Sequence, residues 1–176
     1  MHGKTSRKAS VIKRLRYLWI MELFDSFFLP AVALFVAWRL QRPLDFFAIS
    51  SAVLVAWLLW QGAAYWWLKL RSVKTDSAIA AMHLRWFRRL KNVNRLLIGL
   101  LPIVLIVKGL LSTFFASSLD LVVGVGFYLL AVLEQINYYH VQLMYDGRAD
   151  WRYLLTHKRL KRSKLSQDLA RLDSRR

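Results

Sequence analysis

The chain has 176 residues, of which 57% are hydrophobic and 14% aromatic, and it carries a formal net charge of +17. A soluble globular domain holds less apolar sequence than this, and several apolar runs of about 20 residues argue against a basic nucleic-acid-binding module. The absence of cysteine excludes disulfides, thiolate metal sites and thiol redox chemistry.

Four segments are long and apolar enough to cross a membrane as helices. A hydrocarbon layer about 30 Å thick requires about 20 apolar helical residues, and residues 17–40, 44–68, 96–116 and 119–143 meet this requirement. Short turns at 41–43 and 117–118 join the members of each pair. The sequence therefore predicts an all-α integral membrane protein with two helical hairpins, at 17–68 and 96–145.

Basic residues predict the orientation of these hairpins. Six Lys or Arg residues precede the first span, eight lie between the second and third spans, and ten follow the fourth. The other three are Arg39 and Arg42 at the first turn and Lys108 inside a span. Because Lys and Arg accumulate on the cytoplasmic side, we expect both termini in the cytoplasm and the chain in the cell membrane.

Three basic cytoplasmic segments follow from this topology: an N-terminus at 1–16, a connector at 69–95 and a tail at 146–176. Apolar residues recur at helical spacing in the connector and in the tail, which predicts amphipathic helices. Each basic residue near an anionic leaflet contributes about 1 kcal/mol to binding. The candidates for binding lipid headgroups or an acidic partner protein are Arg85, Arg88, Arg89, Lys91, Lys158, Arg159, Lys161 and Arg162.

The two halves of the chain resemble each other. Leu29 and Pro30 match Leu101 and Pro102 at an offset of 72, and the aromatic ends of the second and fourth spans align at an offset of 73. We interpret this as a parallel repeat, with chance similarity of apolar composition as the alternative.

Polar residues within or at the edges of the spans form a second set of candidates. They are Glu22, Asp25, Gln61, Lys108, Glu134, Asn137 and His140. An ionised group at the bilayer centre costs roughly 3 kcal/mol, so such groups usually have partners inside the bundle. Their depths predict a Lys108–Glu134 ion pair with Asp25 or Glu22 nearby.

Three interpretations of this polar set remain open: fixing the register of the helices, handling an ion or proton, or binding a metal or lipid headgroup. A di-metal bundle would need histidine where the chain has Asn137, which argues against such a site. No catalytic motif is present, and neither a metal nor a cofactor is expected.

Two stretches resemble small bacterial four-span membrane proteins that are often labelled only as general stress proteins. They are residues 134–143 (EQINYYHVQL), followed by Tyr145 and Asp146, and residues 17–26 (YLWIMELFDS). The resemblance implies a bacterial membrane and four spans, and it implies no activity.

The expected function is that of a non-enzymatic scaffold or accessory subunit. Its expected partners are anionic membrane lipids, a protein complex or further copies of itself, and not nucleic acid. The alternatives are a small transporter or proton- or ion-coupled protein that uses intramembrane carboxylates, and a membrane-embedded lipid enzyme.

Overall fold

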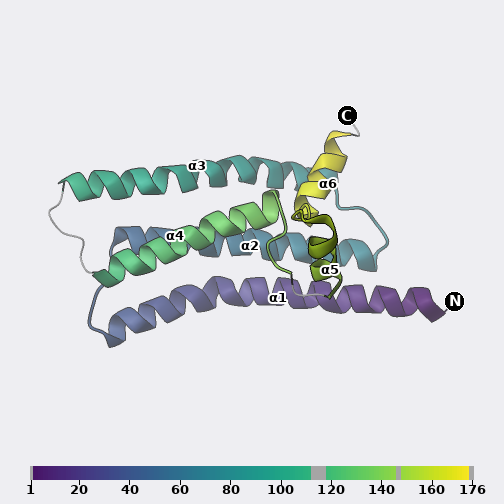
Figure 1. Cartoon of the computed structure of the whole chain (residues 1–176), viewed down its shortest axis with the longest axis horizontal. Helices are drawn as coiled ribbons and strands as arrows, with labels where there is room; N and C mark the ends of the chain where they lie inside the picture. The colour runs from purple at the N-terminus through teal and green to yellow at the C-terminus, as the bar shows by residue number, and fades with distance from the viewer. Residues whose placement is uncertain (1, 112–117, 146–147, 175–176) are drawn as a thin grey trace.

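The computed structural model describes the backbone of residues 2–111, 118–145 and 148–174, with the side chains of residues 2–5, 108–109, 111, 118 and 148–150 outside that description. These residues form α-helices and no β-strand, so the described part of the chain is all-α, as predicted (Figure 1). The helices are α1 (His2–Arg39), α2 (Phe46–Lys74), α3 (Ala81–Leu111), α4 (Ser118–Tyr139), α5 (Arg148–His157) and α6 (Lys164–Asp173). The four long helices, α1 to α4, each hold a stretch apolar and long enough to cross a membrane.

Helix α2 lies at the centre of the bundle. It packs against α1 on one side and α4 on the other, whereas α3 contacts α2 and α4 less extensively. The main core consists of Phe47, Leu54, Val55, Leu58 and Leu59 from α2, Leu101 from α3 and Ala131 from α4. The α1–α2 pair is therefore packed more closely than the α3–α4 pair, an asymmetry that the similarity of the two halves did not predict.

A glycine allows α4 to approach α2 closely. A Cβ atom at Gly124 would lie 2.4 Å from Cδ1 of Phe47 and 3.2 Å from Cα of Ala48. Close approach of helix backbones at small residues is a usual way for membrane helices to pack, because lipid supplies no hydrophobic driving force between them.

Two aspartates join the starts of α2 and α4. The Asp45 carboxylate accepts a hydrogen bond from the Phe46 N–H and so caps α2, as expected for an aspartate at this position. The N–H of Asp45 donates to Oδ1 of Asp120 at 2.7 Å, and Asp120 is fully buried in the first turn of α4. A negative charge at a helix N-terminus is also favoured by the helix dipole.

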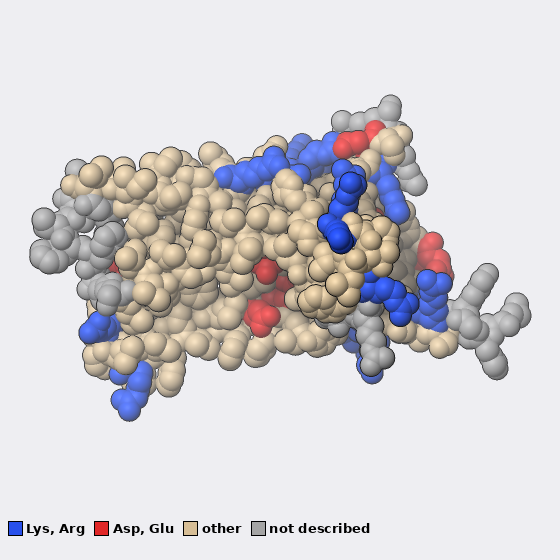
Figure 2. Space-filling view, in the orientation of Figure 1, with Lys and Arg blue, Asp and Glu red and all other residues tan. Residues whose placement is uncertain are grey.

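The middle of the bundle shows few charged side chains on its outer surface, and most Lys and Arg side chains lie toward one end (Figure 2). Outward-facing side chains in the middle include Phe27, Val53 and Ile106, all at least 60% exposed. Contiguous apolar surface of this kind is unfavourable in water. We call the end formed by the start of α1, the end of α2, the start of α3 and helices α5–α6 the basic end.

Helix covers most of the predicted basic connector at 69–95. Residues 69–74 complete α2 and residues 81–95 form the first turns of α3, so only residues 75–80 lie between the two helices. Asp76 in this loop pairs with Lys8 of α1 at 2.6 Å. The amphipathic pattern in 81–95 thus belongs to the start of a long apolar helix rather than to a separate surface helix.

The C-terminal segment folds back onto the bundle instead of lying apart from it. The N–H of Gln142 donates to the Lys161 carbonyl at 2.7 Å, and the N–H of Ser163 donates to the His140 carbonyl at 3.2 Å. Ser163 then caps α6 by accepting from the Ser166 N–H. As a result, the apolar residues Leu165 and Leu169 are buried against α2, α3 and α4.

Candidate functional site

A buried amide network joins α2, α3 and α4 near the basic end. Asn94 is fully buried, and its Nδ2 donates to Oε1 of Gln61 at 2.9 Å and to Oε1 of Gln135 at 3.3 Å. Gln61 returns a bond to Oδ1 of Asn94 at 3.1 Å. Trp57 and Tyr139 donate to Asn94 and Gln61, at 3.2 and 2.9 Å. Buried amides with this many partners fix how the three helices sit against one another.

A carboxylate–tyrosine contact joins α1 to α4 across α2. The Tyr138 hydroxyl donates a short hydrogen bond to the Glu22 carboxylate. The tyrosine ring crosses α2 at Gly62, where a Cβ atom would lie 2.1 Å from the hydroxyl oxygen. On α4 itself, Nδ2 of Asn137 donates to Oε2 of Glu134 at 3.3 Å.

The polar set predicted within the spans is thus divided among several places. Gln61 belongs to the amide network, whereas Glu22, Glu134 and Asn137 lie near Tyr138. Asp25 lies near Glu22 and Glu134. The side chain of Lys108 lies outside the described residues, so its ion pair with Glu134 stays a prediction.

His140 follows directly after α4 and is exposed. Its Nε2 lies 3.3 Å from Nη2 of Arg95. Partial desolvation of the ring lowers the pKa of His140, and the neighbouring charges of Lys91 and Arg95 lower it further. His140 therefore belongs to the basic end and not to the carboxylate group around Tyr138.

Asp168 anchors α6 to the end of α2. Its carboxylate accepts a hydrogen bond from the Tyr65 hydroxyl at 2.9 Å and pairs with Nζ of Lys69 at 2.6 Å. Arg88 of α3 also pairs with Asp173. The buried Leu165 and Leu169 flank these polar contacts, so α6 is attached by an apolar face and by charges.

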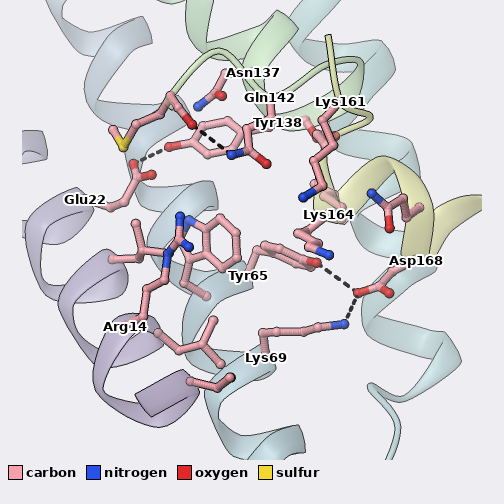
Figure 3. A pocket seen from close by; sticks show the side chains of 18 of the residues that line it. Arg14, Glu22, Tyr65, Lys69, Asn137, Tyr138, Gln142, Lys161, Lys164 and Asp168 are labelled. Atoms are coloured by element: carbon pink, nitrogen blue, oxygen red, sulfur yellow. Dashed lines mark hydrogen bonds and ion pairs between the residues drawn. The ribbon is translucent and has the colours of Figure 1, made fainter. Parts of the chain in front are cut away.

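A cavity of about 490 Å³ lies between α1, the end of α2 and the C-terminal segment (Figure 3). Figure 3 shows Arg14 on one side of it and Lys161 and Lys164 on the other, with Glu22 and Tyr138 at one end. Its apolar lining includes Val11, Leu15, Leu18 and Leu165. Burial lowers the pKa of Lys164, and repulsion from Lys161 and Lys69 lowers it further.

The basic residues predicted to bind headgroups differ in their surroundings. Arg85, Arg89, Lys158, Arg159 and Arg162 are exposed, and Lys161 lines the cavity. Arg88 pairs with Asp173, while Nζ of Lys91 lies 3.5 Å from the Tyr139 carbonyl. Sequence reasoning did not single out Asn94, Asp168 or the cavity residues Arg14, Lys69 and Lys164.

The described residues hold no group of three or more His, Asp or Glu side chains placed to bind a metal ion. Comparisons of the chain with protein-family models, with curated proteins and with solved structures found no match.

Proposed function

We propose that the chain is a multi-pass protein of the bacterial cytoplasmic membrane, with both termini in the cytoplasm, that acts as a non-enzymatic scaffold or accessory subunit. One observation carries this proposal: basic side chains gather at one end of a bundle of four span-length apolar helices (Figure 2). Cytoplasmic loops of membrane proteins carry this excess of Lys and Arg. The basic end would then lie at the anionic surface of the inner leaflet.

The use of polar residues supports a structural role. Gln61, Asn94 and Gln135 bond to one another, and Asp168 is engaged by Tyr65 and Lys69. These side chains hold helices together, as hydrogen-bonded polar side chains do across many helix interfaces in membranes.

Anionic lipid is the partner that the basic end fits best. Arg85 and Arg89 on the first turns of α3 are exposed beside the exposed Trp86, and the Arg89 guanidinium lies 5.8 Å from the centre of that ring. A tryptophan beside basic residues is typical of the headgroup region, where an aromatic ring meets the apolar layer and cations meet phosphate. An acidic partner protein remains the other candidate for the same face.

Labelling of single cysteines tests the topology, and the native chain has no cysteine to interfere. Leu40→Cys, at the turn between α1 and α2, and Ala78→Cys, in the loop between α2 and α3, are both at exposed positions at opposite ends of the bundle. A membrane-impermeant maleimide added to intact cells should label Leu40→Cys and leave Ala78→Cys unlabelled until the membrane is opened. Labelling of both positions from the same side would refute the four-span topology.

Purification of the full chain in mild detergent tests the partner. Lipid analysis should find phosphatidylglycerol or cardiolipin enriched over the bulk membrane, because the basic end attracts anionic headgroups. Lipid recovered in the bulk proportions, together with a stoichiometric acidic protein, would favour the protein partner instead.

A proton- or ion-coupled function is the second candidate, and the Glu22–Tyr138 contact beside Glu134 favours it. Carboxylates within spans mark many ion and proton paths. Proton flux into vesicles that contain the purified chain, abolished by Glu134→Gln and kept by Asp76→Asn in the exposed loop, would establish this function over the scaffold.

A further inference from the structure

We propose that the cavity between α1, the end of α2 and the C-terminal segment binds one anionic phospholipid, whose headgroup phosphate lies among Arg14, Lys161 and Lys164. This inference rests on the membrane placement proposed above and adds a discrete, saturable site to it. The site differs from the exposed cations of α3 because it is a defined hollow built from three separate parts of the chain.

The wall that α1 contributes has both an apolar and a charged part. Val11, Leu15, Leu18 and Glu22 follow one another at three- or four-residue spacing, so they lie on one face of the helix, and Arg14 borders that face. At a rise of 1.5 Å per residue, Arg14 and Glu22 are separated by roughly 12 Å along the axis. This length is comparable to a headgroup, its glycerol and the first carbons of an acyl chain.

Cations outnumber acids around the cavity. The basic lining residues are Arg14, Lys69, Lys161, Lys164 and Arg171, and the acidic ones are Glu22 and Asp168. Glu22 accepts a hydrogen bond from Tyr138, and Asp168 accepts one from Tyr65 and pairs with Lys69 and Arg171. The net positive charge favours an anionic ligand, and a phosphate would relieve the repulsion among Lys69, Lys161 and Lys164.

The direction of α6 adds to this attraction. The helix begins at Lys164, and Ser163, Lys164 and Leu165 all line the cavity. The N-terminus of a helix carries a partial positive charge, which favours a phosphate near it. Here the charge supplements a cluster of side-chain cations and does not by itself make the site.

The apolar lining distinguishes a lipid from a free phosphate. Val11 and Leu18 would remain in contact with water if only an inorganic ion were bound, whereas an acyl chain would cover them. The volume of about 490 Å³ is in the range of small-molecule sites and suits the polar part of a phospholipid, with its chains continuing into the bilayer.

The test is a titration of phosphatidylglycerol into the full chain held in phosphatidylcholine-containing micelles, read by native mass spectrometry. The native chain should bind one phosphatidylglycerol with saturation. Arg14→Gln combined with Lys164→Gln should weaken this binding at least tenfold, because two cations that face the phosphate are removed. The matched control, Lys13→Gln combined with Arg16→Gln, removes the same charge from exposed positions on α1 that do not line the cavity, and it should change the affinity less than twofold.

A second variant separates filling of the cavity from loss of charge. Leu18→Trp keeps every cation and places a larger side chain in the cavity, so it should also prevent saturable binding. If the melting temperature shows that the charge variant does not fold, Leu18→Trp alone tests whether the lipid binds in the cavity.

Three results would overturn the proposal. Equal weakening by both double variants would show that binding follows surface charge alone, which leaves the scaffold proposal intact. Displacement of the lipid by an equal concentration of inorganic phosphate would assign the site to a free ion. Undiminished binding by Leu18→Trp would place the lipid elsewhere. The cysteine-labelling experiment tests the membrane topology independently of all three.

Discussion

Gly62 lies where the Tyr138 side chain crosses α2 on its way to Glu22. An added Cβ would lie 2.1 Å from the hydroxyl oxygen and 2.4 Å from Cζ of that ring. We expect Gly62→Ala to displace Tyr138 and to lower the free energy of unfolding by about 1–3 kcal/mol, the usual cost of overpacking. Thermal unfolding in detergent measures this loss.

Gly126 on α4 provides the matched control, because a Cβ there meets no atom within 4 Å. Alanine favours a helix over glycine by about 1 kcal/mol, so Gly126→Ala should keep or raise the melting temperature. A similar melting temperature for Gly62→Ala and Gly126→Ala would contradict the proposed crossing of Tyr138 over Gly62.

Asn94 is the centre of the amide network, and its loss would leave polar groups of Gln61 and Gln135 buried without this partner. We expect Asn94→Ala to destabilise the chain by about 1–3 kcal/mol. Asn92 lies on the same helix and is exposed, so Asn92→Ala should change stability by less than about 0.5 kcal/mol. Equal unfolding temperatures for the two variants would mean that the network contributes nothing.

The low pKa of His140 also predicts a dependence on pH. Because the folded chain binds the proton more weakly than the unfolded chain, the contribution of His140 to stability is fully present above the unfolded pKa of 6.5 and is lost as the pH falls through the lower pKa of the folded chain. Arg95→Gln removes one of the repelling charges and should raise the pKa of His140. NMR titration of the ring protons measures this shift, and an unchanged pKa would show that the Arg95 charge does not contribute to it.

Helix α6 is held to the bundle by contacts that one substitution can weaken. Asp168→Asn keeps an oxygen that can accept from Tyr65 and removes the charge opposite Lys69, which lies 2.6 Å away. A hydrogen bond to a charged group contributes about 1.5–3 kcal/mol, so we expect trypsin to cleave at Lys161, Arg162 and Lys164 several-fold faster. Asp173→Asn, at an exposed position beside Arg88, is the control and should have a smaller effect.

The long helices could be predicted from sequence because their length and hydropathy reflect only local composition. The start of α3 and the position of α6 could not be predicted from the sequence. The basic residues of 81–95 resemble a surface connector, yet the backbone stays helical because no proline or glycine interrupts it before Gly99. The amphipathic spacing in the tail correctly predicted the apolar face of α6. Spacing alone does not indicate whether protein or lipid covers that face.

The candidate site was predictable only in part for a similar reason. Charged residues within apolar runs, such as Glu22 and Glu134, stand out in a sequence because they are costly in a membrane. Asn94 and Arg14 lie next to basic residues, so they do not stand out from a surrounding apolar run. Asn94 is nevertheless fully buried, and Arg14 lines the cavity. Their roles follow from contacts between distant parts of the chain, which hydropathy does not report.

At the scale of the whole molecule, three basic segments gather at one end of the bundle (Figure 2). If each segment contributes to orientation, removal of most of the charges from one segment should not invert the chain. We therefore expect a variant with glutamine at Lys4, Arg7, Lys8 and Lys13 to keep Leu40→Cys accessible to an external maleimide. Loss of labelling at that position would show that the N-terminal segment alone sets the topology.

The anchoring of α6 on α2 also has a consequence for synthesis. Tyr65 and Asp168 are 103 residues apart in the chain. At about 5–20 residues per second, the ribosome needs roughly 5–20 s to make the intervening segment. During that interval α3 and α4 are produced while the Tyr65 hydroxyl and the Lys69 amine still await their carboxylate, so the basic end can be completed only after the last two spans exist.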